Sequence, residues 1–142
     1  VEPGHQFEWV WLLHAYARAS GTPVHPRADK LYAFACSTLD DDGRALQEVT
    51  REGAIANGSR RTWPQTEALK AHLAMFEVTD EDAFAAAACR SFDVLMDEYL
   101  TPEGGWIDQY DSTGKPMSQN MPASTGYHVV LAMAEMMRIM DA

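Results

Sequence analysis

A histidine and a glutamate near the start of the chain have the spacing of neighbours on one helix face. His5 and Glu8 are three positions apart, and residues at that spacing lie side by side on an α-helix. Glu8 stands within an apolar run that begins at Phe7, and a buried carboxylate is costly unless it is paired. Either this helix lines a polar pocket suited to acid–base chemistry, or Glu8 only pairs locally at the helix start.

A second group of candidate residues stands at the beginning of another predicted helix. Trp63 offers a flat apolar surface that suits the C–H face of a sugar, and Arg61 precedes it. Glu67 falls in the first turn of the helix, where a carboxylate often complements the helix dipole. On spacing alone this capping role is favoured over a role for Glu67 in a pocket.

A second histidine, His128, lies near the N-terminal end of an apolar helix. The positive end of a helix dipole disfavours an imidazolium, and a neutral imidazole can act as a base near neutral pH. The alternative is a core histidine that makes a single hydrogen bond. Taken by itself, the position of His128 favours this second interpretation.

Five helices are predicted to position these residues, so the expected fold class is all-α. Gly and Pro residues and acidic first turns set the expected bounds. The polar stretch 43–61 contains Asn57–Gly58, which could close a short hairpin, and the stretch 101–120 is expected to form a long loop or hairpin. The predicted helices cover residues 5–19, 26–39, 64–76, 79–99 and 122–140.

Strongly apolar helices alternate with amphipathic ones along the chain. Helices 5–19 and 122–140 carry apolar residues on nearly every side, which predicts burial on most sides, whereas helix 26–39 has an exposed polar face. Two concentric rings of helices require this alternation, because inner helices are covered and outer helices face water on one side.

Composition excludes several classes of function. The formal net charge of −10 argues against nucleic acid as a partner, since phosphate binding needs clustered Lys and Arg. No stretch reaches the ~18 consecutive apolar residues of a membrane span, and no signal peptide is recognisable. Cys36 and Cys89 are far apart and form no CxxC motif, so two free thiols in a cytoplasmic protein are expected.

Three motifs together resemble the N-acylglucosamine 2-epimerase superfamily. They are Glu2-Pro3-Gly4-His5 with Phe7-Glu8-Trp9, then Arg61 with Trp63-Pro64-Gln65-Thr66-Glu67, then Pro122-Ala123-Ser124-Thr125 with Tyr127-His128. Their order and spacing resemble the isomerase branch, which includes mannose isomerases, sulfoquinovose isomerase and zinc-independent mannose-6-phosphate isomerases. One departure is Gly126, where the family usually has Pro.

The resemblance implies an (α/α)6 barrel with a sugar pocket at one end. It assigns the two motif histidines to His5 and His128, the pocket carboxylates to Glu8 and Glu67, and the family arginine to Arg61. Arg61, Trp63, Glu8 and Glu67 would then bind substrate. No metal and no cofactor are implied.

The implied reaction is an aldose–ketose isomerisation of the mannose/fructose type, possibly on a 6-phosphorylated sugar, through a cis-enediol. His128 would shuttle the proton between C2 and C1, and His5, oriented by Glu8, would open the ring or act on the other face. A sugar 2-epimerase is the alternative within the family.

Three further hypotheses stay open at this point. A metal-dependent isomerase could use His5 and Glu8 as ligands, because helical carboxylate–histidine pairs bind metals. A glycoside hydrolase of related barrel shape would use two carboxylates. A helical fragment without catalytic activity is the third.

The resemblance also bears on how much of the barrel the chain contains. The family barrel has twelve helices, so residues 1–142 are expected to be the C-terminal part of one catalytic domain. Helices that lack neighbours would expose an apolar flank. We therefore expect self-association or pairing with the N-terminal half, and a small-molecule sugar or sugar phosphate as the substrate.

Overall fold

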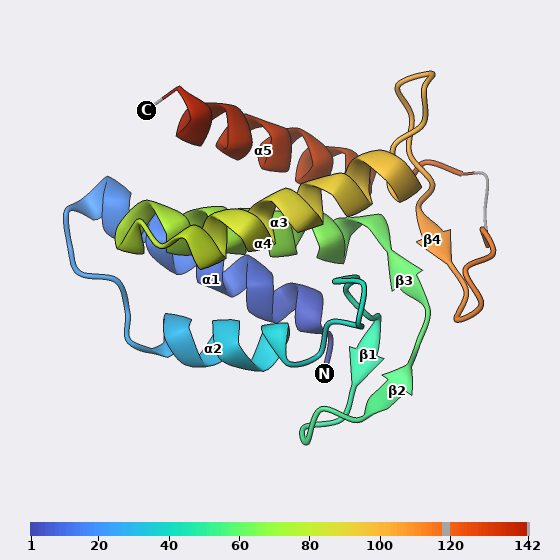
Figure 1. The fold of residues 1–142 in the computed structure, drawn as a ribbon, viewed down its shortest axis with the longest axis horizontal. Coiled ribbons are helices and arrows are strands. Elements are labelled where there is room, and N and C mark those ends of the chain that lie inside the picture. Colours follow the sequence, from blue (N-terminus) through green and yellow to red (C-terminus); the bar gives the residue numbers. More distant parts are fainter. Residues whose placement is uncertain (118–119, 142) are drawn as a thin grey trace.

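The computed structural model describes residues 1–117 and 120–141, which fold mainly into five α-helices (Figure 1). The helices are α1 (Pro3–Ser20), α2 (Arg27–Cys36), α3 (Thr62–Thr79), α4 (Asp82–Val94) and α5 (Ala123–Met140), and a π-helical turn (Leu95–Tyr99) continues α4. Four short strands complete the described part: β1 (Glu48–Val49), β2 (Ile55–Asn57), β3 (Arg60–Arg61) and β4 (Gln109–Tyr110). The predicted all-α class and the five predicted helices are confirmed.

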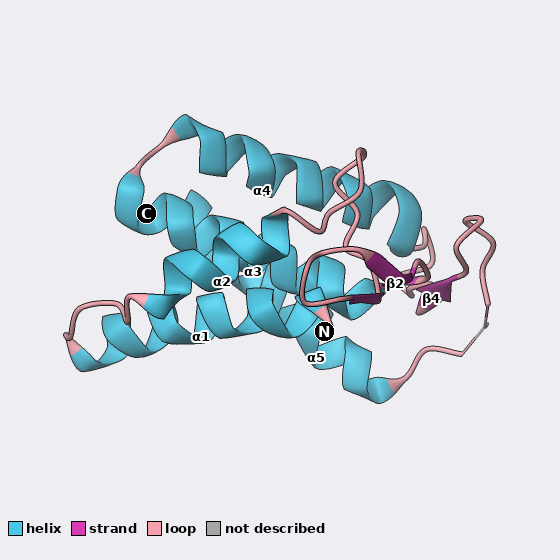
Figure 2. Ribbon diagram, turned by 90° about the horizontal axis from the view of Figure 1, so that it is seen from below, coloured by secondary structure: helices cyan, strands magenta, loops and turns pink. Residues whose placement is uncertain are grey.

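Helix α3 is the central element. Every residue from Thr62 to Met75 is buried, because α1, α4 and α5 all pack against this helix, while α2 packs on α1 (Figures 1 and 2). One apolar cluster joins α1, α2 and α3 around Phe7 and Val10, and another joins α3, α4 and α5 around Leu69 and Leu95. The core thus lies on opposite sides of α3.

The prediction that the first and last helices are buried on most sides is wrong for the described chain. Helices α1 and α5 flank α3, and each keeps a stripe of large apolar side chains in solvent because its outer flank has no neighbour among the described elements. The stripes agree with the expected apolar flank. They consist of Trp9, Leu12 and Tyr16 on α1, and of Tyr127, Val130, Leu131, Met137 and Met140 on α5.

The hairpin predicted at Asn57–Gly58 is also wrong. Strands β1 and β2 do pair antiparallel, but the chain turns between Thr50 and Ala54, where the Thr50 N–H donates to the Ala54 carbonyl oxygen (2.7 Å). The Asn57 side chain instead accepts from the Ser59 N–H (3.0 Å). Strand β3 then pairs with β4, which brings the loop that precedes α5 to the start of α3.

Helix α3 is longer than predicted at its C-terminal end. It runs to Thr79, where the sequence suggested that the next helix begins, and α4 starts only at Asp82. Asp80 ends α3 in the left-handed conformation with φ of 57°, and its N–H donates to the Phe76 carbonyl oxygen (2.8 Å). The acidic run Asp80-Glu81-Asp82 therefore contains both the end of α3 and the start of α4.

Two further findings concern the cysteines and the question of a membrane-spanning helix. Cys36 and Cys89 are free thiols, as expected. Within the described residues, no helix combines the length and the apolar character that a bilayer crossing demands.

The first prediction concerns His72, a buried residue of α3 whose Nδ1 lies 2.7 Å from the Tyr32 hydroxyl. Burial, and secondly the charge of Arg90, lowers the pKa of His72 to about 4. The unfolded chain binds this proton below about pH 6.5, so the free energy of unfolding should fall as the pH drops. From about pH 7 to about pH 5 we expect His72 to account for a loss of about 2 kcal/mol.

Urea unfolding at the two pH values measures this loss. The His72→Gln variant should show a smaller decline in the free energy of unfolding than the unmodified chain. The control His25→Gln, at an exposed position, should show the same decline as the unmodified chain. An equal decline in His72→Gln would contradict the assignment to His72.

Candidate active site

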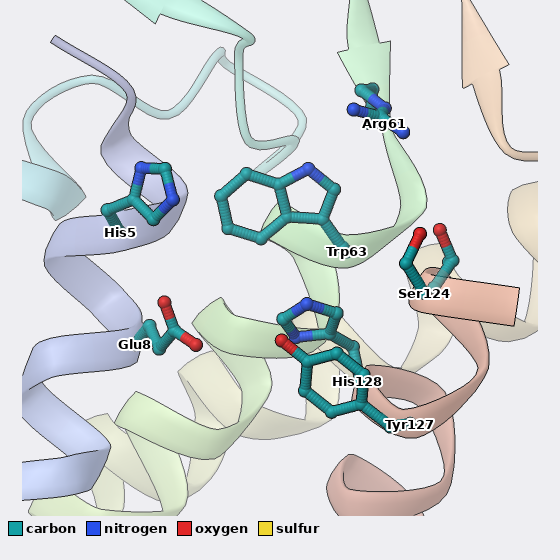
Figure 3. Close-up of a pocket in the computed structure, with 8 residues that line it drawn as sticks. His5, Glu8, Arg61, Trp63, Ser124, Tyr127 and His128 are labelled. Atoms are coloured by element: carbon teal, nitrogen blue, oxygen red, sulfur yellow. The ribbon is translucent and has the colours of Figure 1, made fainter. Parts of the chain in front are cut away.

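A pocket lies where the N-terminal ends of α1, α3 and α5 converge (Figure 3). The N-terminal turns of α1 and α5 and the junction of β3 with α3 each contribute side chains to it. The three motifs, far apart in sequence, therefore meet at one place. The lining residues are His5, Glu8, Arg61, Trp63, Ser124, Thr125, Tyr127 and His128.

Trp63 lies between the two histidines. The centroid of its ring system is 4.9 Å from that of His5 and 5.4 Å from that of His128. Gly4 makes this position possible, because a Cβ atom there would lie 2.6 Å from two atoms of the Trp63 ring. Trp63 is only 8% exposed, so most of its surface contacts protein, and a smaller part is open to the pocket than the sequence suggested.

His128 is anchored from behind by a carboxylate. Its Nδ1 lies 2.5 Å from Oε1 of Glu67, and the residue as a whole is 8% exposed. A carboxylate only accepts hydrogen bonds, so Nδ1 carries the proton in this contact and the neutral ring keeps its lone pair on Nε2. This arrangement suits a base.

Glu67 lies behind His128, whereas the sequence analysis placed it on the pocket wall as a substrate ligand. Its side chain is completely buried and does not line the pocket. Its Oε1 also accepts from Nζ of Lys70, at 2.9 Å. Glu67 therefore contacts the base and the ammonium group, and His128 separates it from the pocket.

The expected pairing of His5 with Glu8 is not found. His5 is exposed, and its Nδ1 lies 2.9 Å from Oε2 of Glu2, which precedes α1. Glu8, one turn further along α1, points toward the side of the pocket that holds His128 (Figure 3). Burial, followed by the charges of Glu8 and Glu67, raises the pKa of the Tyr127 hydroxyl.

Arg61 is held in place by a residue that the sequence analysis missed. One guanidinium nitrogen of Arg61 lies 3.0 Å from Oδ2 of Asp108, and Oδ1 of the same carboxylate accepts from the Thr125 hydroxyl (2.7 Å). Asp108 is buried and its backbone oxygen accepts from the Thr62 N–H (3.0 Å). It thus ties the loop before α5 to the first turns of both α3 and α5.

Within the described chain, one group of side chains could share a cation. Donor atoms of Glu8, Glu67 and His128 lie within 4.8 Å of one another. His5, which the metal hypothesis paired with Glu8, is not in this group. The ammonium of Lys70 already supplies a positive charge to the shared oxygen of Glu67.

Comparison with known proteins identifies the family. A profile of the N-acylglucosamine 2-epimerase (GlcNAc 2-epimerase) family matches residues 1–132. The chain belongs to this family. A mannose-6-phosphate isomerase of Rhizobium meliloti (strain 1021) is 32% identical over 143 residues, covering 96% of this chain and 37% of that protein. The family match confirms the predicted superfamily, and the relative named as an isomerase supports the predicted branch.

Solved structures extend the likeness to the fold. The crystal structure of a D-mannose isomerase matches with a TM-score of 0.88 at 22% identity, covering 97% of this chain and 37% of that one. A cellobiose 2-epimerase from Spirochaeta thermophila DSM 6192 matches with a TM-score of 0.81 at 24% identity, covering 99% and 38%. These likenesses establish the fold as part of an (α/α)6 barrel.

The chain therefore spans well under half of the length of these relatives. Gly126, which the resemblance marked as a departure, lies close to Trp106. A Cβ atom on Gly126 would lie 3.3 Å from the Trp106 ring, which covers this turn of α5 next to His128.

The second prediction concerns Gly4. In Gly4→Ala the new methyl group would meet the Trp63 ring at 2.6 Å, so the ring must move away from its place between the histidines. Overpacking costs about 1–3 kcal/mol, which exceeds the gain of about 0.5–1 kcal/mol for Ala over Gly within a helix. We expect lower stability and a displaced indole signal of Trp63 in 1H–15N NMR.

The control is Gly58→Ala, because the nearest atoms around a Cβ at Gly58 lie at an ordinary 3.5 Å. An unchanged Trp63 signal in Gly4→Ala would show that the close contact does not position the ring.

Proposed function

We propose that the chain forms part of the active site of a sugar isomerase that interconverts an aldose and a ketose of the mannose/fructose type. The observation that carries the proposal is the contact between Nδ1 of His128 and the buried Glu67, which leaves Nε2 as a base beside the pocket. The name of the relative that is 32% identical, a mannose-6-phosphate isomerase, supports the substrate class.

The proposed chemistry is proton transfer through a cis-enediol. The proton on C2 of the open-chain sugar is acidic only because the adjacent carbonyl takes up the negative charge. Nε2 of His128 removes this proton and returns it to C1 on the same face, while a hydroxyl proton passes from O2 to O1 and Glu67 stabilises the imidazolium that forms. Arg61 and His5 would bind the sugar oxygens, and His5 would assist ring opening.

A 2-epimerase is the second candidate, and the position of Trp63 favours it specifically. Epimerisation at C2 needs acid–base groups on both faces of the carbon. His5 and His128 lie on either side of the Trp63 ring, with centroid distances of 4.9 and 5.4 Å. A sugar held against the exposed part of Trp63 could therefore meet one imidazole from each side.

The hydrolase hypothesis has less support. A glycosidase needs two carboxyl groups that flank the scissile bond. Of the two candidates, Glu8 lines the pocket, but Glu67 is completely buried and bonded to His128 and Lys70. Glu67 does not line the pocket, so it is not placed to flank a bond of the substrate.

Incubation with candidate sugars in D2O tests the proposed function. The full-length protein is mixed with mannose, fructose, mannose 6-phosphate or N-acetylmannosamine, and NMR follows the proton on C2 and the product. Deuterium at C1 of fructose or at C2 of mannose supports the isomerase. Exchange with inversion at C2 supports the epimerase, and the absence of both exchange and conversion with every sugar rejects both.

The third prediction is that His128→Ala in the full-length protein abolishes the exchange of the C2 proton. Loss of a general base typically lowers the rate by a factor of about 100 to 10,000. The fold should persist, and circular dichroism checks this. The control is His25→Ala, an exposed residue of the loop before α2, which should exchange at the unmodified rate. Exchange in His128→Ala within about tenfold of that rate would remove His128 from catalysis.

We further propose that the apolar stripes on α1 and α5 pack against the remaining helices of the barrel. Inner helices of a closed ring need neighbours on both flanks, and the chain spans only 37% of the D-mannose isomerase that shares its fold. Exposed apolar surface of this kind is rarely tolerated in a monomer. The rest of the barrel is therefore the proposed occupant, and association between copies of the chain is the expected substitute.

The fourth prediction follows from the stripes. Light scattering should show that the chain, expressed alone, self-associates, and that co-expression with the rest of the barrel yields a one-to-one complex. Replacing Tyr16 and Val130 by Lys should weaken the self-association, because both side chains are exposed within the stripes. The control is Ile55→Lys, an equally exposed apolar residue on β2. A monomeric chain, or association that the stripe variants leave unchanged, would contradict the proposal.

A further inference from the structure

Lys70 is a buried lysine in the middle of α3. Its side chain is 1% exposed, and it does not line the pocket. Its ammonium contacts the carboxylate of Glu67 at 2.9 Å and lies 4.0 Å above the ring centroid of Trp11, a half-buried residue of α1. A buried lysine is costly, and here the carboxylate and the aromatic face both compensate it.

The position of Lys70 links it to the proposed base. One oxygen, Oε1 of Glu67, accepts hydrogen bonds from both Nζ of Lys70 and Nδ1 of His128. The fully buried carboxylate carries one negative charge, and either donor could balance it by being positive. An ammonium group ordinarily holds its proton more tightly than an imidazolium does, which favours Lys70 for this role.

The other charged or titratable groups around His128 come from every element packed against it. Glu8 and His5 face it from α1, and Arg61 lies at the entry to α3. Tyr127 stacks beside it on α5, with ring centroids 3.8 Å apart. Glu8 would favour a protonated His128 and Arg61 would oppose one, and both are more exposed than the Glu67–Lys70 pair.

We propose that Lys70, held against Trp11, is a positioning residue that neutralises Glu67 and thereby keeps His128 in the uncharged form able to accept a proton. Without the ammonium, the buried carboxylate would be left unbalanced, and protonation of His128 would become the way to neutralise it. The benefit for catalysis rests on the proposed function. The effect on the protonation of His128 does not.

NMR titration of the His128 ring in the sugar-free, full-length protein tests the inference. The signal is assigned by its loss in His128→Gln. In Lys70→Met the midpoint of the titration should rise by about 1–3 pH units, the range for an altered charge at this separation. Lys70→Arg keeps the charge and should restore the original midpoint. The control is Lys30→Met, an exposed lysine of α2, which should leave the midpoint unchanged.

A second pair of variants covers the case in which Lys70→Met does not fold. Glu67→Gln and the double variant Glu67→Gln/Lys70→Met are compared, and the double variant replaces the buried pair by neutral side chains of similar size. Because the buried pair and its replacement are both neutral overall, the double variant should titrate close to the unmodified protein. A midpoint in Lys70→Met that moves by less than about half a pH unit, or one in the double variant that moves by more than about one, overturns the inference.

The rate of C2 exchange provides an independent readout. In Lys70→Met the acidic limb of the pH–rate profile should move to higher pH by the same amount as the titration midpoint. A merely structural role would lower the rate at every pH without moving the limb, and that result would also overturn the inference. Absence of exchange in the unmodified protein rejects the proposed function and leaves the titration result standing.

Discussion

The negative charge of Glu67 is the constraint on which the rest of the site depends. A carboxylate with no exposure needs hydrogen-bond donors of its own, and it finds them in His128 from α5 and Lys70 from its own helix. Removing water from around these groups strengthens their attraction. The full burial of α3 between Thr62 and Met75 is therefore a requirement of the site as well as a property of the core.

The pocket is assembled by contacts that fix the N-terminal ends of the helices relative to one another. Trp63 fits against α1 because Gly4 has no side chain, and Asp108 connects Arg61 to Thr125 at the start of α5. Each contact fixes one helix start relative to α3. The three motifs are consequently held in a common frame even though two of the three helices lack a neighbour on their outer flank among the described elements.

Helix positions followed well from the sequence, because apolar spacing, Pro at helix starts and Gly at helix ends act locally. The convergence of His5, Trp63 and His128 was accessible only through the family resemblance. Two contacts were not foreseen: His5 pairs with Glu2, and Glu67 lies behind His128. The first has the same three-residue spacing as the predicted pair of His5 with Glu8, so spacing alone does not choose between them. The second depends on where side chains point after α5 has packed on α3, which spacing along one helix does not determine.

The missed residues show the same limit. Lys70 lies three positions after Glu67 in the sequence. A lysine among apolar residues of a buried helix is a usable signal of a paired charge. Asp108 offered none, because it lies in an irregular loop and its partners are 47 and 17 positions away. The hairpin turn at 50–54 was missed because Asn57–Gly58 is the stronger local turn sequence.

The attachment of Arg61 to Asp108 couples two tasks within the site. The groups proposed to move protons sit on helices, where a change of backbone would disturb the whole core. The cationic side chain at the pocket edge is oriented by a loop residue, and the same carboxylate holds Thr125 at the start of the helix that carries His128. A substitution at residue 108 should therefore affect both the admission of the sugar and the placement of the base, so selectivity and acid–base chemistry cannot be changed independently at this position.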